Sequence, residues 1–175
     1  MEDAMRFWQQ RLVTPAIVLG MALGTLGLFD ASLGHAAPTA QITQAGDGIE
    51  LEYTGEDGKS AKEVIPLYKV GSARYFSTGI GLEERTAQYP PFPLKLVFIA
   101  GAKAYVTQVA VTIKDTKGEM RLLIPDDQVK GPWLFVDLPA STYDIIAVRR
   151  DRAEVTQRVE IVPGRTTVAY FRWKE

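Results

Sequence analysis

The sequence predicts an all-β protein whose C-terminal part is a two-sheet β-sandwich. Short runs of alternating apolar and polar residues recur, and turn-forming residues such as Pro163-Gly164 separate one run from the next. Seven of these runs follow the prolines at 90–93, with the spacing that is typical of a sandwich. The expected strands are 94–99, 105–113, 120–124, 133–138, 142–148, 154–162 and 166–173.

Residues 37–93 predict a small β-hairpin region and one short helix ahead of a sandwich domain at 94–175. Residues 38–48 are small and polar, which predicts a flexible lead-in. Strands are expected at 49–54, 61–70 and 74–77. Pro66 cannot donate a backbone hydrogen bond, and this places its strand at a sheet edge or a bulge. The helix is expected at 82–88, because acidic residues begin it and prolines end it.

Residues 1–36 predict a signal peptide that is removed after Ala36. Arg6 and Arg11 precede an uncharged apolar run at 12–29, and Gly34 and Ala36 have the spacing of a cleavage site. The alternative is an uncleaved membrane anchor through 12–29, since this run is near the minimum length for a spanning helix. Both forms predict that the folded part is exported, to the periplasm or the extracellular space.

Composition excludes several classes of function. The net charge is −1 and no strongly basic, aromatic-rich stretch is present, which argues against nucleic-acid binding. The chain has no cysteine, and its one histidine, His35, lies in the predicted signal peptide. A mature chain would therefore hold neither a Cys–His nor a Ser–His–Asp catalytic site. We expect no catalytic residue, no enzyme activity and no cofactor.

Without histidine or cysteine, calcium is the one metal that the remaining side chains could hold. Asp126, Asp127 and the loop at 115–119 offer oxygen ligands, but their spacing matches no EF-hand. Adjacent carboxylates such as Glu83-Glu84 need not face one glycosidic bond, as a glycosidase pair must. We interpret all of these acids as solvated charge, and expect no metal site.

The stretch GPWLFVDLPASTYDIIAVRR resembles a hairpin of carboxypeptidase regulatory-like modules, which are also similar to transthyretin. It combines a strand, the turn Leu138-Pro139-Ala140-Ser141 and a return strand that begins near Tyr143. The resemblance covers residues 94–173 and implies a Greek-key sandwich. Family members usually have glycine where this chain has Ser141, so we expect a turn without a left-handed residue. We also expect the ring of Tyr143 to be buried, with its hydroxyl bonded to backbone near the turn.

These patterns favour a non-enzymatic exported protein that acts by binding, as a protein-interaction or accessory subunit in the cell envelope. Arg149, Arg150 and Arg152 lie at an expected hairpin tip and could dock an acidic protein or an anionic lipid, unless the tip is simply a solvated turn. The alternative is a carbohydrate- or cell-wall-binding module. Trp133 and Trp173 are its candidate stacking residues, although both rings could instead fill the core.

Overall fold

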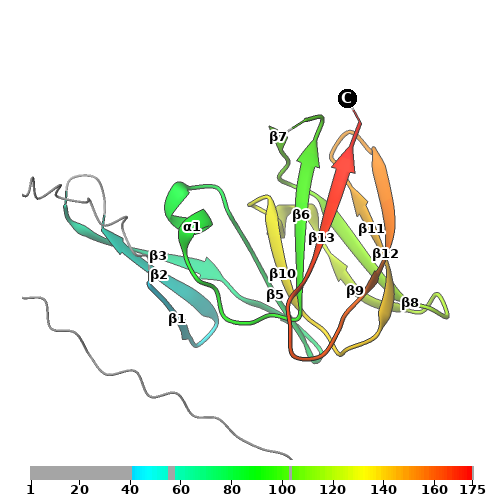
Figure 1. Ribbon diagram of the computed structural model, residues 1–175, viewed down its shortest axis with the longest axis horizontal. Coiled ribbons are helices and arrows are strands. Elements are labelled where there is room, and N and C mark those ends of the chain that lie inside the picture. Colours follow the sequence, from blue (N-terminus) through cyan, green and yellow to red (C-terminus); the bar gives the residue numbers. More distant parts are fainter. Residues whose placement is uncertain (1–40, 55–57, 103, 175) are drawn as a thin grey trace, which may run out of the picture. The chain divides into compact units, whose positions relative to one another are not determined.

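The computed structural model describes residues 41–54, 58–102 and 104–174 (Figure 1). The expected signal peptide lies outside these residues. No helix among the described residues is long and apolar enough to cross a membrane. Strands dominate the described part, so the all-β class is confirmed.

The strands lie close to the expected runs, with additions at the N-terminal end. They are β1 Gln41–Ala45, β2 Gly48–Thr54, β3 Ser60–Pro66, β4 Tyr68–Val70, β5 Ala73–Thr78, β6 Leu94–Ala100, β7 Ala104–Tyr105, β8 Ala110–Asp115, β9 Met120–Ile124, β10 Trp133–Asp137, β11 Thr142–Val148, β12 Glu154–Glu160 and β13 Thr167–Trp173. The expected helix is confirmed as α1 Leu82–Thr86, and a 3₁₀ turn follows β9 at Asp126–Gln128.

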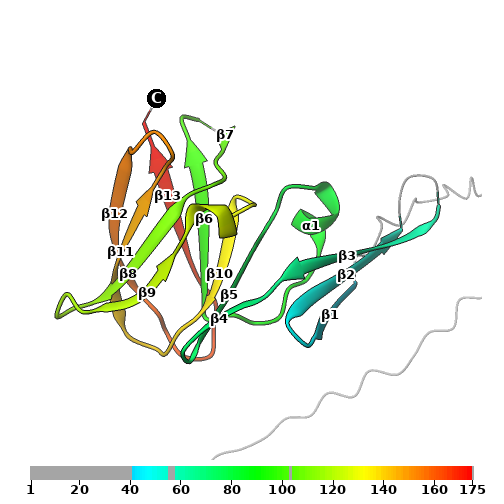
Figure 2. The ribbon, with the colours of Figure 1, turned by 180° about the vertical axis from the view of Figure 1, so that it is seen from behind.

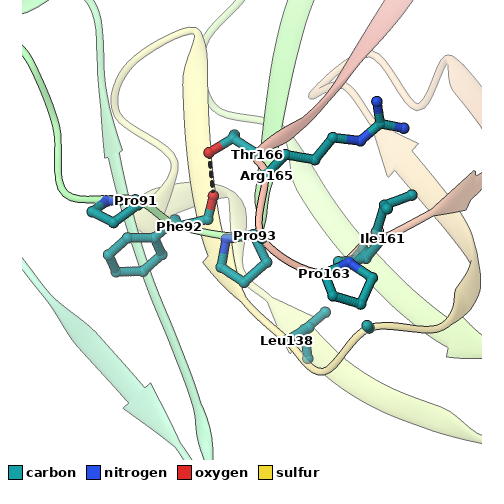
Figure 3. Close-up of a pocket in the computed structure, with 11 residues that line it drawn as sticks. Pro91, Phe92, Pro93, Leu138, Ile161, Pro163, Arg165 and Thr166 are labelled. Atoms are coloured by element: carbon teal, nitrogen blue, oxygen red, sulfur yellow. Dashed lines mark hydrogen bonds between the residues drawn. The ribbon is translucent and has the colours of Figure 1, made fainter.

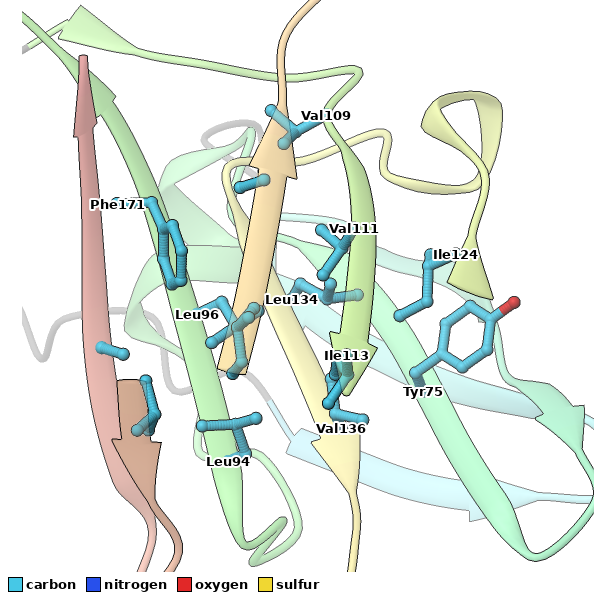
Figure 4. Packing of buried hydrophobic residues seen from close by; sticks show 14 of the residues in the cluster. Tyr75, Leu94, Leu96, Val109, Val111, Ile113, Ile124, Leu134, Val136 and Phe171 are labelled. Atoms are coloured by element: carbon cyan, nitrogen blue, oxygen red, sulfur yellow. The ribbon is translucent and has the colours of Figure 1, made fainter. Parts of the chain in front are cut away.

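Two sheets share the main apolar cluster. A six-stranded sheet has the order β13-β6-β10-β5-β4, with β7 paired to β6, and a four-stranded sheet has the order β12-β11-β8-β9 (Figures 1 and 2). Leu96, Leu134 and Phe171 from the first sheet pack with Val111 and Ile113 from the second (Figure 4). The alternation in the sequence is the cause, because every second residue of a strand points to the same face.

Sheet pairing crosses the expected division at residue 93. Strand β5 pairs with β10 along its length, from Trp133↔Thr78 to Asp137↔Arg74. It is suited to a central position because Tyr75 points to the main cluster while Phe76 points to the opposite face of the sheet. The six-stranded sheet therefore includes β4 and β5, which we expected in the hairpin region.

A second apolar cluster lies on the other face of the six-stranded sheet. It joins Phe76 of β5 and Phe135 of β10 to Phe92, and Ile49 and Ile65 of the separate sheet β1-β2-β3 complete it together with Leu67. The rings of Phe76 and Phe135 stack with centroids 4.7 Å apart. The small sheet is thus attached to the six-stranded sheet by apolar contacts.

Two local expectations were wrong. The lead-in is a strand from residue 41, because β1 pairs with β2 from Gln41↔Glu52 to Ala45↔Gly48. The run at 105–113 is interrupted between β7 and β8, where Gln108 takes a positive φ of 58°. By contrast, Pro66 ends β3 at the edge of its sheet, as expected.

Candidate functional site

The turn at Leu138–Ser141 connects β10 to β11 and is stabilised by a hydrogen bond from Tyr143. Tyr143 is buried, and its hydroxyl donates to the carbonyl of Pro139 at 3.0 Å. Burial raises the pKa of this hydroxyl. Ser141 is not among the described residues with positive φ, so the expectation of a turn without a left-handed residue is confirmed.

The same turn lies between two surface cavities. One has a volume of about 500 Å³ and the other about 710 Å³, and both are lined by Leu138 and Ala140. The larger is polar and includes Lys117 and Arg121, of which Arg121 pairs with Asp115 at 2.6 Å. The smaller has three prolines in its wall and is mainly apolar. The hairpin thus forms part of two concave surfaces.

The three arginines of the expected docking tip make different contacts. Arg149 forms an ion pair with Asp151, and its guanidinium carbon lies 6.0 Å from the ring centre of Trp173. Arg150 lies 3.6 Å from a carboxylate oxygen of Asp126. Arg152 is exposed and has a positive φ of 67°. Two of the three cations therefore have counterions, one within the tip and one in the 3₁₀ turn after β9, and the three do not form one free patch.

The two tryptophans lie in apolar clusters. Trp173 is 3% exposed, and its indole N–H donates to the carbonyl of Ala153 at 3.0 Å. Trp133 is half-buried against the second cluster, and a Cβ at Gly79 would lie 2.9 Å from its ring. The ammonium of Lys95 lies 3.3 Å from the centre of the same ring. Stacking of a sugar on Trp133 would require Lys95 to move.

The paired carboxylates do not converge on a common point. Glu84 is 7% exposed and accepts from Thr78 Oγ1 and from the backbone N–H of Gly79, both at 2.5 Å. Its neighbour Glu83 is only partly buried. The interpretation of Glu84 as solvated charge was therefore wrong, because its carboxylate is buried and connects α1 to the end of β5.

The acids of the second pair, Asp126-Asp127, and of the loop at 115–119 do not gather into a metal site either. Asp126 pairs with Arg150, while Asp127 is exposed. Asp115 accepts from the backbone N–H groups of Lys117 and Glu119, both at 2.9 Å. Among the residues that the structure describes, no group of three metal-ligating side chains gathers.

The outer face of β6 and β13 is a surface that sequence reasoning missed. Across this face, Lys95 pairs with Val168 and Val97 with Tyr170, so these four side chains point away from the core. Tyr170 is 58% exposed and Val168 46% exposed. A signal was present, since 94–99 and 166–173 have large side chains at both odd and even positions. A strand with only one covered face would alternate more strictly.

Cations surround these exposed side chains. The Arg85 guanidinium lies 5.8 Å from the ring centre of Tyr105, which is 50% exposed and pairs with Ile99 on the same face. Lys95 makes no ion pair with any described residue, and partial burial lowers its pKa. Arg172 donates to the carbonyl of Gly101 at 2.6 Å. The outward positions of β6, β7 and β13 hold no acid.

Comparisons with family models, with curated proteins and with solved structures find no match to this chain. Any inference about function therefore starts from the surfaces of the molecule.

Proposed function

We propose that this chain is a non-enzymatic exported protein that acts as an interaction or accessory subunit in the cell envelope. It binds an acidic segment of a partner protein through the outer face of β6, β7 and β13. We call this surface, formed by Arg85, Lys95, Tyr105, Val168, Tyr170 and Arg172, the docking face. One observation carries the proposal: exposed aromatic and apolar side chains lie among cations, and the outward positions of β6, β7 and β13 hold no acid.

The composition of the docking face supports a protein partner. Tyrosine and arginine are the residue types that are enriched where binding energy concentrates in protein interfaces. Lys95 adds a half-buried charge that lacks an anionic partner among the described residues, and a partner carboxylate would stabilise it. The charge of the face therefore favours an acidic segment, with apolar side chains to cover Val168 and Tyr170.

The remaining parts of the proposal follow from the sequence. Export depends on the apolar run at 12–29 and the small residues before Ala37. Kinship of residues 94–173 to Greek-key carboxypeptidase regulatory-like modules depends on the Leu138–Ser141 turn and Tyr143, whose hydroxyl bond to Pro139 supports it. Mass measurement of the protein recovered from its own cells tests export, with a mature chain expected to begin near Ala37.

Site-specific photocrosslinking in the source cells tests the docking face. A photoreactive phenylalanine analogue replaces Tyr170 in the full chain, and a second variant carries it at Leu123, which is similarly exposed (53%) on β9 of the other sheet. We expect a discrete protein adduct from position 170 that is absent from position 123. Adding Lys95→Gln should reduce this adduct.

Three outcomes would contradict the proposal. Equal adduct patterns from positions 170 and 123, or no adduct from position 170, would remove the docking face as a protein-binding site. Cosedimentation of the wild type with purified cell wall, lost in Tyr170→Ser, would favour the carbohydrate- or cell-wall-binding alternative, with Tyr105 and Tyr170 in place of the tryptophans.

A further inference from the structure

The smaller cavity beside the Leu138–Ser141 turn shares no residue with the docking face. Its walls come from Pro91–Pro93 ahead of β6, from Leu138 and Ala140 of the turn, and from residues 161–166 between β12 and β13 (Figure 3). The volume of about 500 Å³ lies within the range of roughly 300–1,000 Å³ that is usual for small-molecule sites. The cavity is therefore large enough for a ligand of its own.

Hydrogen bonds fix the three walls to one another. Thr166 Oγ1 donates to the carbonyl of Phe92 at 2.7 Å, and the backbone N–H of Thr167 donates to the carbonyl of Pro93 at 2.8 Å. The N–H of Ile161 donates to the carbonyl of Ser141, also at 2.8 Å. Each proline has a restricted φ. These constraints hold the cavity open before any ligand arrives, which lowers the entropic cost of binding.

The chemistry of the walls is apolar with a single charge. Leu138, Ile161 and the three prolines supply the apolar surface, and no acidic side chain lines the cavity. Arg165 is the one charged lining residue. It is exposed, and its guanidinium forms no hydrogen bond or ion pair with a described residue. In Figure 3 its side chain extends on the same side of the cavity as Ile161.

We propose that this cavity binds a small carboxylic acid with an apolar tail. The tail packs against Leu138, Ile161 and the prolines, where its removal from water drives binding. The carboxylate lies at the rim and accepts from the Arg165 guanidinium, whose planar N–H groups match the two carboxylate oxygens. A neutral ligand of the same length gains the first contribution only, and a cationic one is repelled by Arg165.

Three ten-carbon ligands that differ only in their head group separate these contributions. Decanoate, decanol and decylammonium are titrated into the full chain below their aggregation concentrations, and dissociation constants are measured by calorimetry. We expect decanoate to bind about tenfold more tightly than decanol, since a charge-assisted hydrogen bond at an exposed rim is worth about that factor. Decylammonium should bind most weakly.

Three substitutions at exposed positions locate the binding. Arg165→Gln should weaken decanoate about tenfold, to the level of decanol, and leave decanol unchanged. Ala140→Phe places a ring in the cavity and should abolish both. Arg152→Gln removes an exposed arginine that does not line the cavity, and should change neither. Thermal melting of each variant verifies that the fold is retained.

The proposal fails under any of four results. One is that none of the ligands binds, and a second is that decanoate binds no more tightly than decanol. Another is that Arg165→Gln binds decanoate as well as the wild type does. The last is that Ala140→Phe, folded as the wild type, retains binding. None of these results depends on the docking face, so its crosslinking experiment is judged separately.

Discussion

Both faces of the six-stranded sheet carry large apolar side chains, but the two faces are covered to different extents. The inner face packs along its length on the four-stranded sheet and includes Phe98 and Phe171, both 0% exposed. The outer face is covered near Phe76 and Phe135 by the second apolar cluster, while Tyr170 and Val168 remain in solvent. A strand with large side chains on both faces therefore needs two covers, and an exposed remainder indicates where a further cover is missing.

The largest expected effect contrasts two neighbours on β13. Phe171→Ala should lower the free energy of unfolding by about 3–5 kcal/mol, because it leaves a cavity in the inner cluster. Tyr170→Ala, on the outer face, should change it by no more than about 0.5–1 kcal/mol. Urea denaturation measures both. Equal losses would mean that the outer face is already covered in the isolated protein.

The backbone of β5 and the segment ahead of β10 approach each other closely at Gly131. A Cβ at Gly131 would lie 2.1 Å from the carbonyl oxygen of Thr78, and Ser77 Oγ accepts from the Gly131 N–H at 2.8 Å. Gly131→Ala should therefore cost at least about 1–3 kcal/mol through forced backbone shifts. Chemical denaturation would detect this loss. A variant as stable as the wild type would contradict so close an approach of Gly131 to Thr78.

The edge of the second cluster can be tested through Tyr89. Burial raises the pKa of its hydroxyl to about 12, and this hydroxyl donates to the carbonyl of Glu84 at 2.8 Å. Tyr89→Phe should cost about 1 kcal/mol at neutral pH.

The pH dependence of this difference has a defined sign. Because the folded pKa exceeds the unfolded value of 10.0, the contribution of Tyr89 is complete below pH 10 and is lost as the pH rises through about 12. The stability difference between wild type and Tyr89→Phe should therefore shrink over this range in denaturation curves. A constant difference up to pH 12 would show that the hydroxyl is solvated.

Smaller effects are expected at the turns that lie outside both clusters. Arg152 has a φ of 67°, which strains any residue with a Cβ. Arg152→Gly should raise stability by about 0.5 kcal/mol, after allowance for the greater entropy of glycine in the unfolded chain. Calorimetric melting measures the change, with Arg150→Gly as the control that should gain nothing.

The smallest effect is expected at the other end of β11. Ser141 is not among the described residues with positive φ, so Ser141→Gly relieves no strain and should lower stability by no more than about 0.5 kcal/mol. An upward shift in melting temperature would contradict this and would mean that the turn is of the left-handed kind that is usual in carboxypeptidase regulatory-like modules.

Much of the fold followed from local pattern, and the docking face did not. The strand at 142–148 was predicted to the residue, because Tyr143, Ile145 and Ala147 alternate with partly exposed positions. β1 was missed, since its residues are mainly polar and only pairing with β2 reveals the strand. The docking face depends on which strands become neighbours, as Lys95 and Tyr170 are far apart in the chain. The large side chains at both odd and even positions of 94–99 and 166–173 indicate that both faces of these strands need a cover, but local patterns do not say which strands lie side by side.

The parallel pairing of β13 with β6 has a consequence for the order in which the six-stranded sheet is completed. Every other pairing in the described part is antiparallel, and β13 is synthesised after all the other strands of its sheet. Until it arrives, β6 presents a row of unpaired backbone groups, and the places of Phe171 and Trp173 in the core are empty. A nascent chain therefore cannot complete this sheet before its last strand is made, and a partly made molecule exposes an open, apolar sheet edge.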